Sequence, residues 1–362
     1  MLNVIDWESP ETHILLNPRM PCEEAQKIHH QLKAFNLSAH VWLATSGTTS
    51  RFKCVALSKE AFLISADAVN RHFQLTADDI WIHCLPDFHV GGLGIHARSY
   101  RSGAKIVKLS PWNCQKFYQM AIDHSATVSS LVPAQLYDII QMNCRAPDSY
   151  RFTIIGGGVI AKEIFEQSWE MGWNAVPTYG MTECASQVAA AAIGDYDQYQ
   201  PLEHVSVQLD DAENILIKSP SLLTGYAFPD AEAAAWEDPK NDGWFRTEDQ
   251  GAIEKGLLQV FGRSSEIIKI NGELVNLLQL QLKLETLQTK MKLRGTFAIV
   301  PVPHPRSGYT LHLAASEENK NQIISLQETY NEAVLPFEKI SRIHQCATIP
   351  RTPLGKIIKL IF

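Results

Sequence analysis

Short β-rich runs alternate with longer helical stretches between residue 40 and about residue 185, and this alternation strongly constrains the fold. The expected strands are HVWLAT, IWIHCL, AKIVKL, ATVSSLV and FTIIG, and the expected helices include SKEAFLISADAVNRHF, NCQKFYQMAIDH, AQLYDIIQMN and KEIFEQSWEM. Strands joined by helix-length connectors predict parallel βαβ units, hence an open α/β sheet with helices on both faces. Ligands of such sheets bind at the loops that follow the carboxyl ends of the strands.

The pattern changes after the predicted sheet. Residues 203–262 contain short strands and turns, which predict an antiparallel, β-rich subdomain packed on the first sheet. The remaining residues mix helix and strand patterns and end in PRTPLGKIIKLIF. We therefore expect a large N-terminal domain over residues 1–263 and a small, mobile α+β C-terminal domain over residues 264–362.

Bulk properties indicate a cytoplasmic protein that acts on small molecules. The net charge is −7, whereas nucleic-acid or anionic-membrane partners require an excess of Lys and Arg. We find no basic N-terminal signal sequence, and no apolar run approaches the roughly 20 residues of a membrane helix. The seven cysteines form no CxxC pair, which argues against a zinc ribbon or redox dithiol.

The stretch TSGTTS, residues 45–50, lies between a predicted strand and a predicted helix. Its hydroxyls, together with backbone N–H groups around Gly47, can donate several hydrogen bonds to phosphate oxygens. It is not a Walker A loop, and its lysine comes later, at Lys53. A solvated turn remains the alternative reading of the stretch taken alone.

Further motifs have compatible chemistry. GGGV (156–159) lets the backbone approach a ligand closely, and YGMTE (179–183) offers an aromatic slot, a hydroxyl and a carboxylate suited to Mg²⁺. Asp249 suits the hydroxyls of a ribose, and Arg263 suits ribose or phosphate oxygens. Taken singly, each of these motifs also fits a turn or a surface charge.

The ordered set TSGTT, FHVGGLG, YGMTE, WFRTED…FGR and PRTPLGK resembles the adenylate-forming superfamily of acyl-CoA synthetases. The resemblance runs from about residue 40 to the C-terminus. The stretch that precedes the TSGTT motif is shorter than the N-terminal subdomain of long family members. FHVGGLGI, SLVPAQLYDII, IIGGGVI and YGMTECASQVA are similar to the o-succinylbenzoate–CoA ligase branch of menaquinone biosynthesis.

The resemblance implies a Mg²⁺- and ATP-dependent acid–CoA ligase that forms an acyl-adenylate and then transfers the acyl group to coenzyme A. The implied phosphate-binding residues are Thr45, Ser46, Gly47, Thr48, Thr49 and Lys53. The implied adenine-site residues are Gly157, Gly158, Tyr179, Gly180 and Met181. Thr182 would contact the α-phosphate, Glu183 would bind Mg²⁺, and Asp249 and Arg263 would bind the ribose.

The resemblance also implies a catalytic lysine, an acyl pocket and a hinge. Lys356 would stabilise the charge that develops at the α-phosphate, and His89 would line the acyl pocket and gate the thiol's approach. The remaining acyl-site candidates are Gly92, Arg98, Asp138 and Ser186. Ser265 would serve as the hinge, while Lys269 and Gly272 would shape the coenzyme A tunnel.

Several positions depart from the family pattern. Ser50, Phe52 and Cys54 replace the residues expected after TSGTT, and Ser265 replaces the usual hinge aspartate. Asp138 stands where an arginine is expected to meet a second carboxylate of the acid. Two carboxylates about 4 Å apart repel by roughly 1 to 4 kcal/mol, so Arg98, one helical turn from Gly94, is the alternative source of positive charge.

Two alternative functions follow from the same motifs: an acyl-AMP ligase that loads a separate carrier-protein thiol, and a degenerate paralogue that binds nucleotide without turnover. The sequence leaves the oligomeric state open, a homodimer included.

Overall fold

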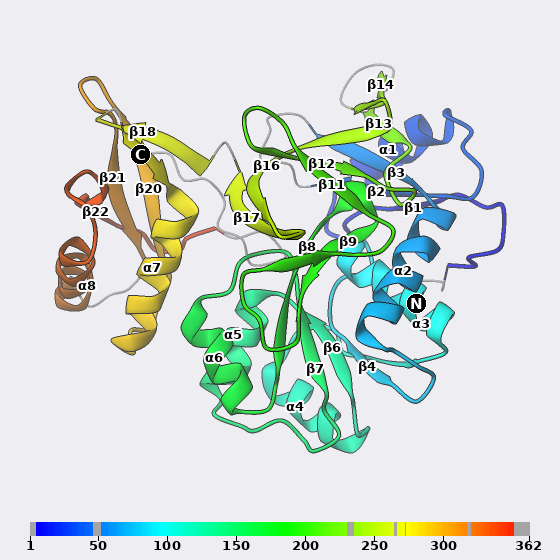
Figure 1. The fold of residues 1–362 in the computed structure, drawn as a ribbon, viewed down its shortest axis with the longest axis horizontal. Helices are drawn as coiled ribbons and strands as arrows, with labels where there is room; N and C mark the ends of the chain where they lie inside the picture. The colour runs from blue at the N-terminus through cyan, green and yellow to red at the C-terminus, as the bar shows by residue number, and fades with distance from the viewer. Residues whose placement is uncertain are drawn as a thin grey trace.

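The computed structural model describes residues 5–45, 52–229, 235–263, 266–271, 273–316 and 320–350, and a large mixed sheet forms its centre (Figure 1). Five of the twelve strands of this sheet are parallel, in the order β5-β4-β6-β7-β8. These strands are β4 (Ile80–His83), β5 (Lys105–Lys108), β6 (Val128–Leu131), β7 (Phe152–Ile155) and β8 (Ala175–Met181). The predicted parallel α/β sheet is confirmed.

Helices cover both faces of the parallel strands. Within β4, Ile82 packs into a core with α4 (Cys114–Asp123), α5 (Pro133–Gln141) and α6 (Lys162–Glu170). The adjacent Trp81 packs on the other face, against α2 (Lys59–Phe73) and α3 (Val90–Ser102). Neighbouring residues of one strand point to opposite faces, so the inner strands β4, β6 and β7 are buried on both sides, whereas β5 is only partly buried.

The segment around TSGTTS differs from the expected strand–loop–helix. β2 (His40–Thr45) and β3 (Lys53–Ser58) form an antiparallel pair, with Thr45 opposite Lys53, and α2 begins only after Ser58, which caps it. The predicted helix over 58–73 is found as α2, but the sequence analysis missed the strand β3, in which the apolar run 54–57 is buried. Both strands belong to a second sheet, order β1-β2-β3-β13-β14.

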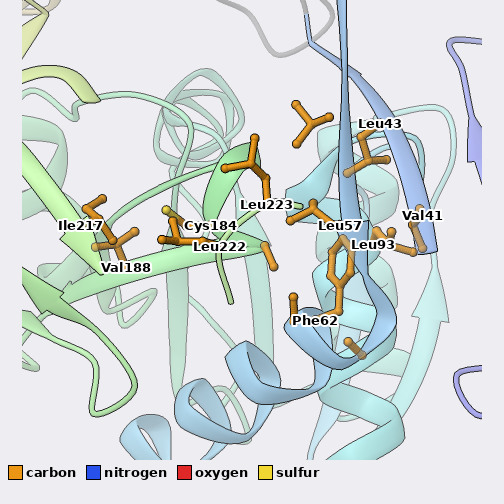
Figure 2. Close-up of a cluster of buried hydrophobic side chains, with 14 of the residues drawn as sticks. Val41, Leu43, Leu57, Phe62, Leu93, Cys184, Val188, Ile217, Leu222 and Leu223 are labelled. Atoms are coloured by element: carbon orange, nitrogen blue, oxygen red, sulfur yellow. The ribbon is translucent and has the colours of Figure 1, made fainter. Parts of the chain in front are cut away.

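The second sheet also contains β1 (His13–Leu15), β13 (Gly225–Phe228) and β14 (Ala235–Glu237), and α1 (Cys22–Lys33) precedes β2. Figure 2 shows the apolar core that joins this sheet to the rest of the molecule. Leu43 and Leu57 from the sheet lie near Leu93 of α3, and the same cluster extends to Val188 of β9 (Ser186–Ala191). Each fully buried side chain of this kind contributes about 1.5–3 kcal/mol, so the two sheets are tightly coupled.

The β-rich region is antiparallel, as predicted, and it continues the central sheet through the pair β8–β9. Its other strands are β10 (Tyr199–Pro201), β11 (Ser206–Leu209), β12 (Asn214–Lys218), β15 (Lys240–Asn241), β16 (Trp244–Glu254) and β17 (Leu257–Arg263). The long hairpin β16–β17 carries two of the predicted ribose-binding residues on adjacent strands.

The C-terminal part has an α+β composition and an apolar core of its own. Its elements are β18 (Ile267–Ile270), β19 (Glu273–Asn276), α7 (Leu277–Lys290), β20 (Phe297–His304), β21 (Gly308–Ala315), α8 (Lys320–Glu332) and β22 (Ile340–Gln345). The fold class is confirmed, and the domain boundary after residue 263 stays a prediction. Within the described ranges, no helix has the length and apolarity that crossing a membrane requires.

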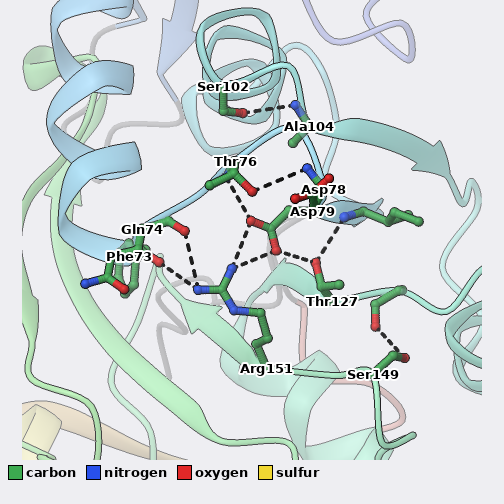
Figure 3. Close-up of polar contacts among 12 residues, drawn as sticks. Phe73, Gln74, Thr76, Asp78, Asp79, Ser102, Ala104, Thr127, Ser149 and Arg151 are labelled. Carbon is green, nitrogen blue, oxygen red and sulfur yellow. Dashed lines mark hydrogen bonds and ion pairs between the residues drawn. The ribbon is translucent and has the colours of Figure 1, made fainter.

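A network of polar side chains connects the amino-terminal ends of the parallel strands (Figure 3). The buried Asp79 carboxylate accepts hydrogen bonds from Arg151 Nη1 at 2.7 and 2.9 Å, and from Thr127 Oγ1 at 2.7 Å. Burial would raise the pKa of Asp79, but the bonds from Arg151, Thr76 and Thr127 outweigh it and lower the pKa. This network lies at the edge opposite the loops that carry the predicted site.

Candidate nucleotide and acyl site

A lysine, a glutamate and a tyrosine from three distant segments meet beside the end of β8. Lys53 Nζ lies 3.2 Å from Glu183 Oε1, and the Tyr226 hydroxyl donates to the same oxygen at 2.8 Å. The Lys53 ammonium also lies 4.1 Å from the centre of the Tyr226 ring. Two predicted residues are therefore brought together, and the cluster is partly buried, with Glu183 only 13% exposed.

Sequence reasoning missed Tyr226, because its position depends on pairing between distant strands. β13 pairs with β3 so that Tyr226 lies opposite Val55 and Ala227 lies opposite Cys54, which brings Tyr226 to Lys53. The local sequence GYAF shows only a buried strand.

The donor set of this cluster fits a phosphate-bound magnesium ion. Mg²⁺ in nucleotide sites is held by one or two carboxylates together with phosphate oxygens, and Glu183 supplies such a carboxylate. Thr182 and Glu183 form the short η1 turn (Thr182–Cys184) directly after β8. Lys53 adds a positive charge suited to the same phosphates.

A second constellation joins Tyr179 of β8 to the β16–β17 hairpin. The Tyr179 hydroxyl donates to Asp249 Oδ2 at 2.8 Å, and Arg263 Nε lies 3.7 Å from Asp249 Oδ1. Asp249 and Arg263 are direct partners in the strand register. Burial raises the pKa of Tyr179 well above its ordinary value, and the adjacent Asp249 carboxylate raises it further, so the phenol remains a donor.

Glycines allow close backbone approach at two predicted positions. A Cβ atom on Gly180 would lie 1.9 Å from the Ser186 carbonyl oxygen, so the close pairing of β8 and β9 leaves no room for a side chain at this position. Gly157, in the exposed loop after β7 with Gly158, has a φ of +77°, which L-residues rarely adopt. Met181 ends β8 at the same edge of the sheet.

His89 lies at the start of α3, where it is the residue immediately before the helix. Its Nε2 atom is buried and has no hydrogen-bond partner among the described residues. Burial lowers the pKa of His89, which keeps the imidazole neutral near pH 7. Three residues later, a Cβ atom on Gly92 would lie 2.2 Å from the Pro86 carbonyl oxygen, so α3 packs directly on the segment before it.

Arg98 is a buried cation that lacks a carboxylate partner in the described part of the chain. Its side chain is 2% exposed, its Nη2 donates to Ser186 Oγ at 2.9 Å, and its Nε has no partner there. Burial lowers the pKa of Arg98 to about 10. A Cβ atom on Gly94, one turn earlier, would lie 3.3 Å from Arg98 Nη2 and 3.4 Å from Ser186 Oγ. Such a guanidinium suits an anionic ligand, since an unpaired buried charge is costly.

Asp138 lies in a different environment from Arg98. Its Oδ2 accepts a hydrogen bond from Trp112 Nε1 at 2.8 Å, and it lines an open groove with Asn113 and Cys114. No hydrogen bond or ion pair joins it to His89 or Arg98 among the described residues. Its role at the acyl group stays a prediction.

The remaining predicted residues are not described at the level of side chains. Ser46, Gly47, Thr48, Thr49, Ser265, Gly272 and Lys356 lie outside the described residues, and so does Ser50. Thr45 and Lys269 are described by backbone alone, in β2 and β18. Their roles stay predictions.

Comparison with known proteins identifies related ligases. The 2-succinylbenzoate–CoA ligase of Enterococcus faecalis is 28% identical over 333 residues, covering 87% of this chain and 67% of the relative. The enzyme of that name from Geobacillus sp. is 32% identical over 247 residues, covering 63% of this chain and 49% of the relative. The chain therefore spans about half to two thirds of the length of these relatives.

Solved structures share the fold. The o-succinylbenzoate-CoA synthetase MenE of Bacillus subtilis, in complex with the acyl-adenylate intermediate OSB-AMP, superimposes with a TM-score of 0.76 at 22% identity, covering 88% of this chain and 68% of that one. A point variant of E. coli MenE with bound OSB-AMS gives a TM-score of 0.74 at 22% identity, covering 95% of this chain and 85% of that one. The family model described as AMP-binding enzyme matches residues 18–227, which is more than half of the chain. The chain belongs to the AMP-binding enzyme family.

Proposed function

We propose that the chain is an ATP-dependent acid–CoA ligase of the o-succinylbenzoate type, acting through an acyl-adenylate. The observation that carries the proposal is the convergence, around the end of β8, of a nucleotide constellation and a buried cation. Tyr179 near this strand end donates to Asp249, and Ser186, which pairs with Met181 across the β8–β9 hairpin, accepts from Arg98. The relatives named 2-succinylbenzoate–CoA ligase support the same assignment.

In the first step, an oxygen of the substrate carboxylate attacks the α-phosphorus of ATP, and the bond to the bridging oxygen breaks as pyrophosphate leaves. Asp249 would accept hydrogen bonds from the ribose hydroxyls, with Tyr179 fixing its carboxylate. Lys53 would face the leaving phosphates from the cluster with Glu183. Mg²⁺ held by Glu183, when bound, neutralises phosphate charge.

In the second step, the coenzyme A thiol gives up its proton to solvent and its sulfur bonds to the acyl carbon, while the bond from that carbon to the phosphate oxygen breaks and AMP leaves. Lys356 would serve mainly the first step, since its charge opposes the charge that develops between carboxylate and α-phosphate. His89, neutral and with its buried Nε2 available as a polar contact, would line the acyl group at the start of α3.

Arg98 and Ser186 would recognise a second anionic group of the acid. A buried guanidinium gains most from a carboxylate, which can accept two parallel N–H bonds and neutralise the charge. On this proposal, Arg98 of α3 supplies the positive charge that the family pattern would put at the position of Asp138. We therefore propose a dicarboxylic substrate of the o-succinylbenzoate class.

Pyrophosphate release from ATP with a panel of mono- and dicarboxylic acids, with and without coenzyme A, tests the proposal. We expect release that depends on a dicarboxylate and a CoA thioester as the final product. Release with no thioester formed would favour transfer to a carrier-protein thiol. Nucleotide binding without release for any acid would favour the non-catalytic paralogue.

A further inference from the structure

A polar cluster separate from the nucleotide constellation lies at the carboxyl ends of β4 and β5, centred on Asp87. Asp87 Oδ1 lies 2.5 Å from His83 Nε2 and 2.9 Å from His96 Nε2, and Asp87 Oδ2 pairs with the Lys108 ammonium. The three partners come from the end of β4, from α3 and from the end of β5. We call Asp87, His83, His96 and Lys108 the Asp87 cluster.

The protonation state of this cluster follows from its burial. His83 is fully buried, and burial lowers its pKa despite the adjacent carboxylate, so its ring is neutral and donates to Asp87 through Nε2–H. Burial would raise the pKa of Asp87, but hydrogen bonds from His83, His96 and Lys108 hold it well below its ordinary value. Asp87 therefore stays ionised and accepts from three donors.

Two imidazoles and a carboxylate also form a possible metal-ligand set, since their ligand atoms lie within 4.8 Å of one another. The geometry favours hydrogen bonds. Two ligands of one tetrahedral zinc ion, bound at 2.0–2.2 Å, are about 3.3 Å apart, more than the separations of 2.5 and 2.9 Å found here. Metal-bound histidines also donate their other ring N–H, and His83 Nδ1 has no partner among the described residues.

The Asp87 cluster holds the segment that leads into the acyl site. Asp87 comes two residues before His89, and the Pro86 carbonyl oxygen accepts the His89 backbone N–H at 3.1 Å. His96 anchors α3 itself. Arg98 is two positions further along, about 200° around the helix, so α3 is held on one side and presents its buried cation on the other.

We propose that Asp87 is a positioning residue that fixes α3 and the preceding loop, and thereby sets His89 and Arg98 against the acid. This inference rests on the proposed function. Small displacements of binding groups are costly, since an error of about 1 Å can reduce rates by roughly 100-fold. Asp87→Asn keeps the size of the side chain and removes its charge. It also replaces the oxygen that accepts from the Lys108 ammonium with an NH₂ group, which can only donate.

The expected result is a selective loss of acid binding. In pyrophosphate release, Asp87→Asn should raise the KM for the acid about 10- to 100-fold and leave the KM for ATP unchanged. His96→Leu should have the same effect, whereas His96→Gln, which keeps an N–H donor, should restore most of the wild-type KM. Equal changes in both KM values, or a His96→Gln variant as impaired as His96→Leu, would overturn the proposal.

Asp67→Asn is the matched control, because Asp67 also binds α3, through a bidentate ion pair with Arg101 at 2.7 Å, away from the loop. A readout independent of activity is the His89 imidazole resonance in ¹⁵N-labelled protein. It should shift in Asp87→Asn and not in Asp67→Asn, even if no acid supports turnover. An unchanged His89 resonance in Asp87→Asn would contradict the positioning role. Stoichiometric Zn²⁺ binding that Asp87→Asn abolishes would also overturn the proposal, because the Asp87 cluster would then be a metal site.

Discussion

Replacement of Arg98 by methionine should move protein stability and substrate binding in opposite directions. The side chain is buried, and its pKa is lowered from 12.5 to about 10. At about 1.36 kcal/mol per pKa unit, this burial costs the folded state roughly 3 kcal/mol. Because the folded-state pKa of a base is lowered, the cost is fully present near pH 7, where Arg98 is charged in both states, and it disappears only as the pH rises through both pKa values.

Methionine removes that cost and also the hydrogen bond to Ser186 Oγ, which is worth about 1.5–3 kcal/mol as a bond to a charged group. The free energy of unfolding of Arg98→Met should therefore stay unchanged or rise by about 1 kcal/mol. An arginine with a purely structural role predicts the opposite sign, a loss of stability when Arg98 is replaced.

Substrate binding should weaken at the same time. A dicarboxylate that loses a buried charge partner loses about 2–5 kcal/mol, so its KM should rise at least roughly 30-fold while the KM for a monocarboxylate stays unchanged. Chemical denaturation and pyrophosphate release measure the two effects, with Arg101→Met, an exposed arginine of the same helix, as control. A large loss of stability, or an unchanged KM for the dicarboxylate, would refute the reasoning.

Three further predictions concern separate parts of the chain. Asp79→Asn should lower the free energy of unfolding by about 3 kcal/mol at pH 7, because it breaks a buried pair with Arg151. Since the folded-state pKa of Asp79 is depressed, the difference in stability from wild type should shrink as the pH falls below about 4. Chemical denaturation at pH 7 and pH 3 measures this. Glu183→Gln should reduce pyrophosphate release about 100-fold or more and weaken its Mg²⁺ dependence, measured by Mg²⁺ titration; an unaltered titration would exclude Glu183 as the ligand. Lys356→Ala should abolish adenylation and spare thioester formation from a supplied acyl-adenylate; equal loss of both would place the catalytic lysine elsewhere.

The sequence predicted the parallel half of the fold well because local patterns carry it. The apolar runs that became β4, β6 and β7 alternate with helices that begin and end close to the expected residues. It failed at β3, where the buried run 54–57 follows a polar loop and pairs with β2 and β13 in the second sheet. That pairing, with β13 more than 160 residues away, leaves no local signal.

The residues of the candidate site also divide into those that local sequence predicts and those that depend on the tertiary structure. Asp249 and Arg263 could be predicted together because a short hairpin links them, and Arg98 because helical spacing sets it one turn from Gly94. Tyr226 and Asp87 could not, since their roles depend on which donors and acceptors the tertiary structure brings to one atom. Each alone is compatible with an ordinary buried tyrosine or a loop aspartate.

Exchange of labelled pyrophosphate into ATP tests the central claim most directly, because it detects reversible acyl-adenylate formation without any thiol. We predict exchange that requires Mg²⁺ and a dicarboxylic acid of the o-succinylbenzoate class, and that is lost in Lys356→Ala. Absence of exchange with every acid, in protein that still binds ATP, would contradict the claim that this chain forms an acyl-adenylate.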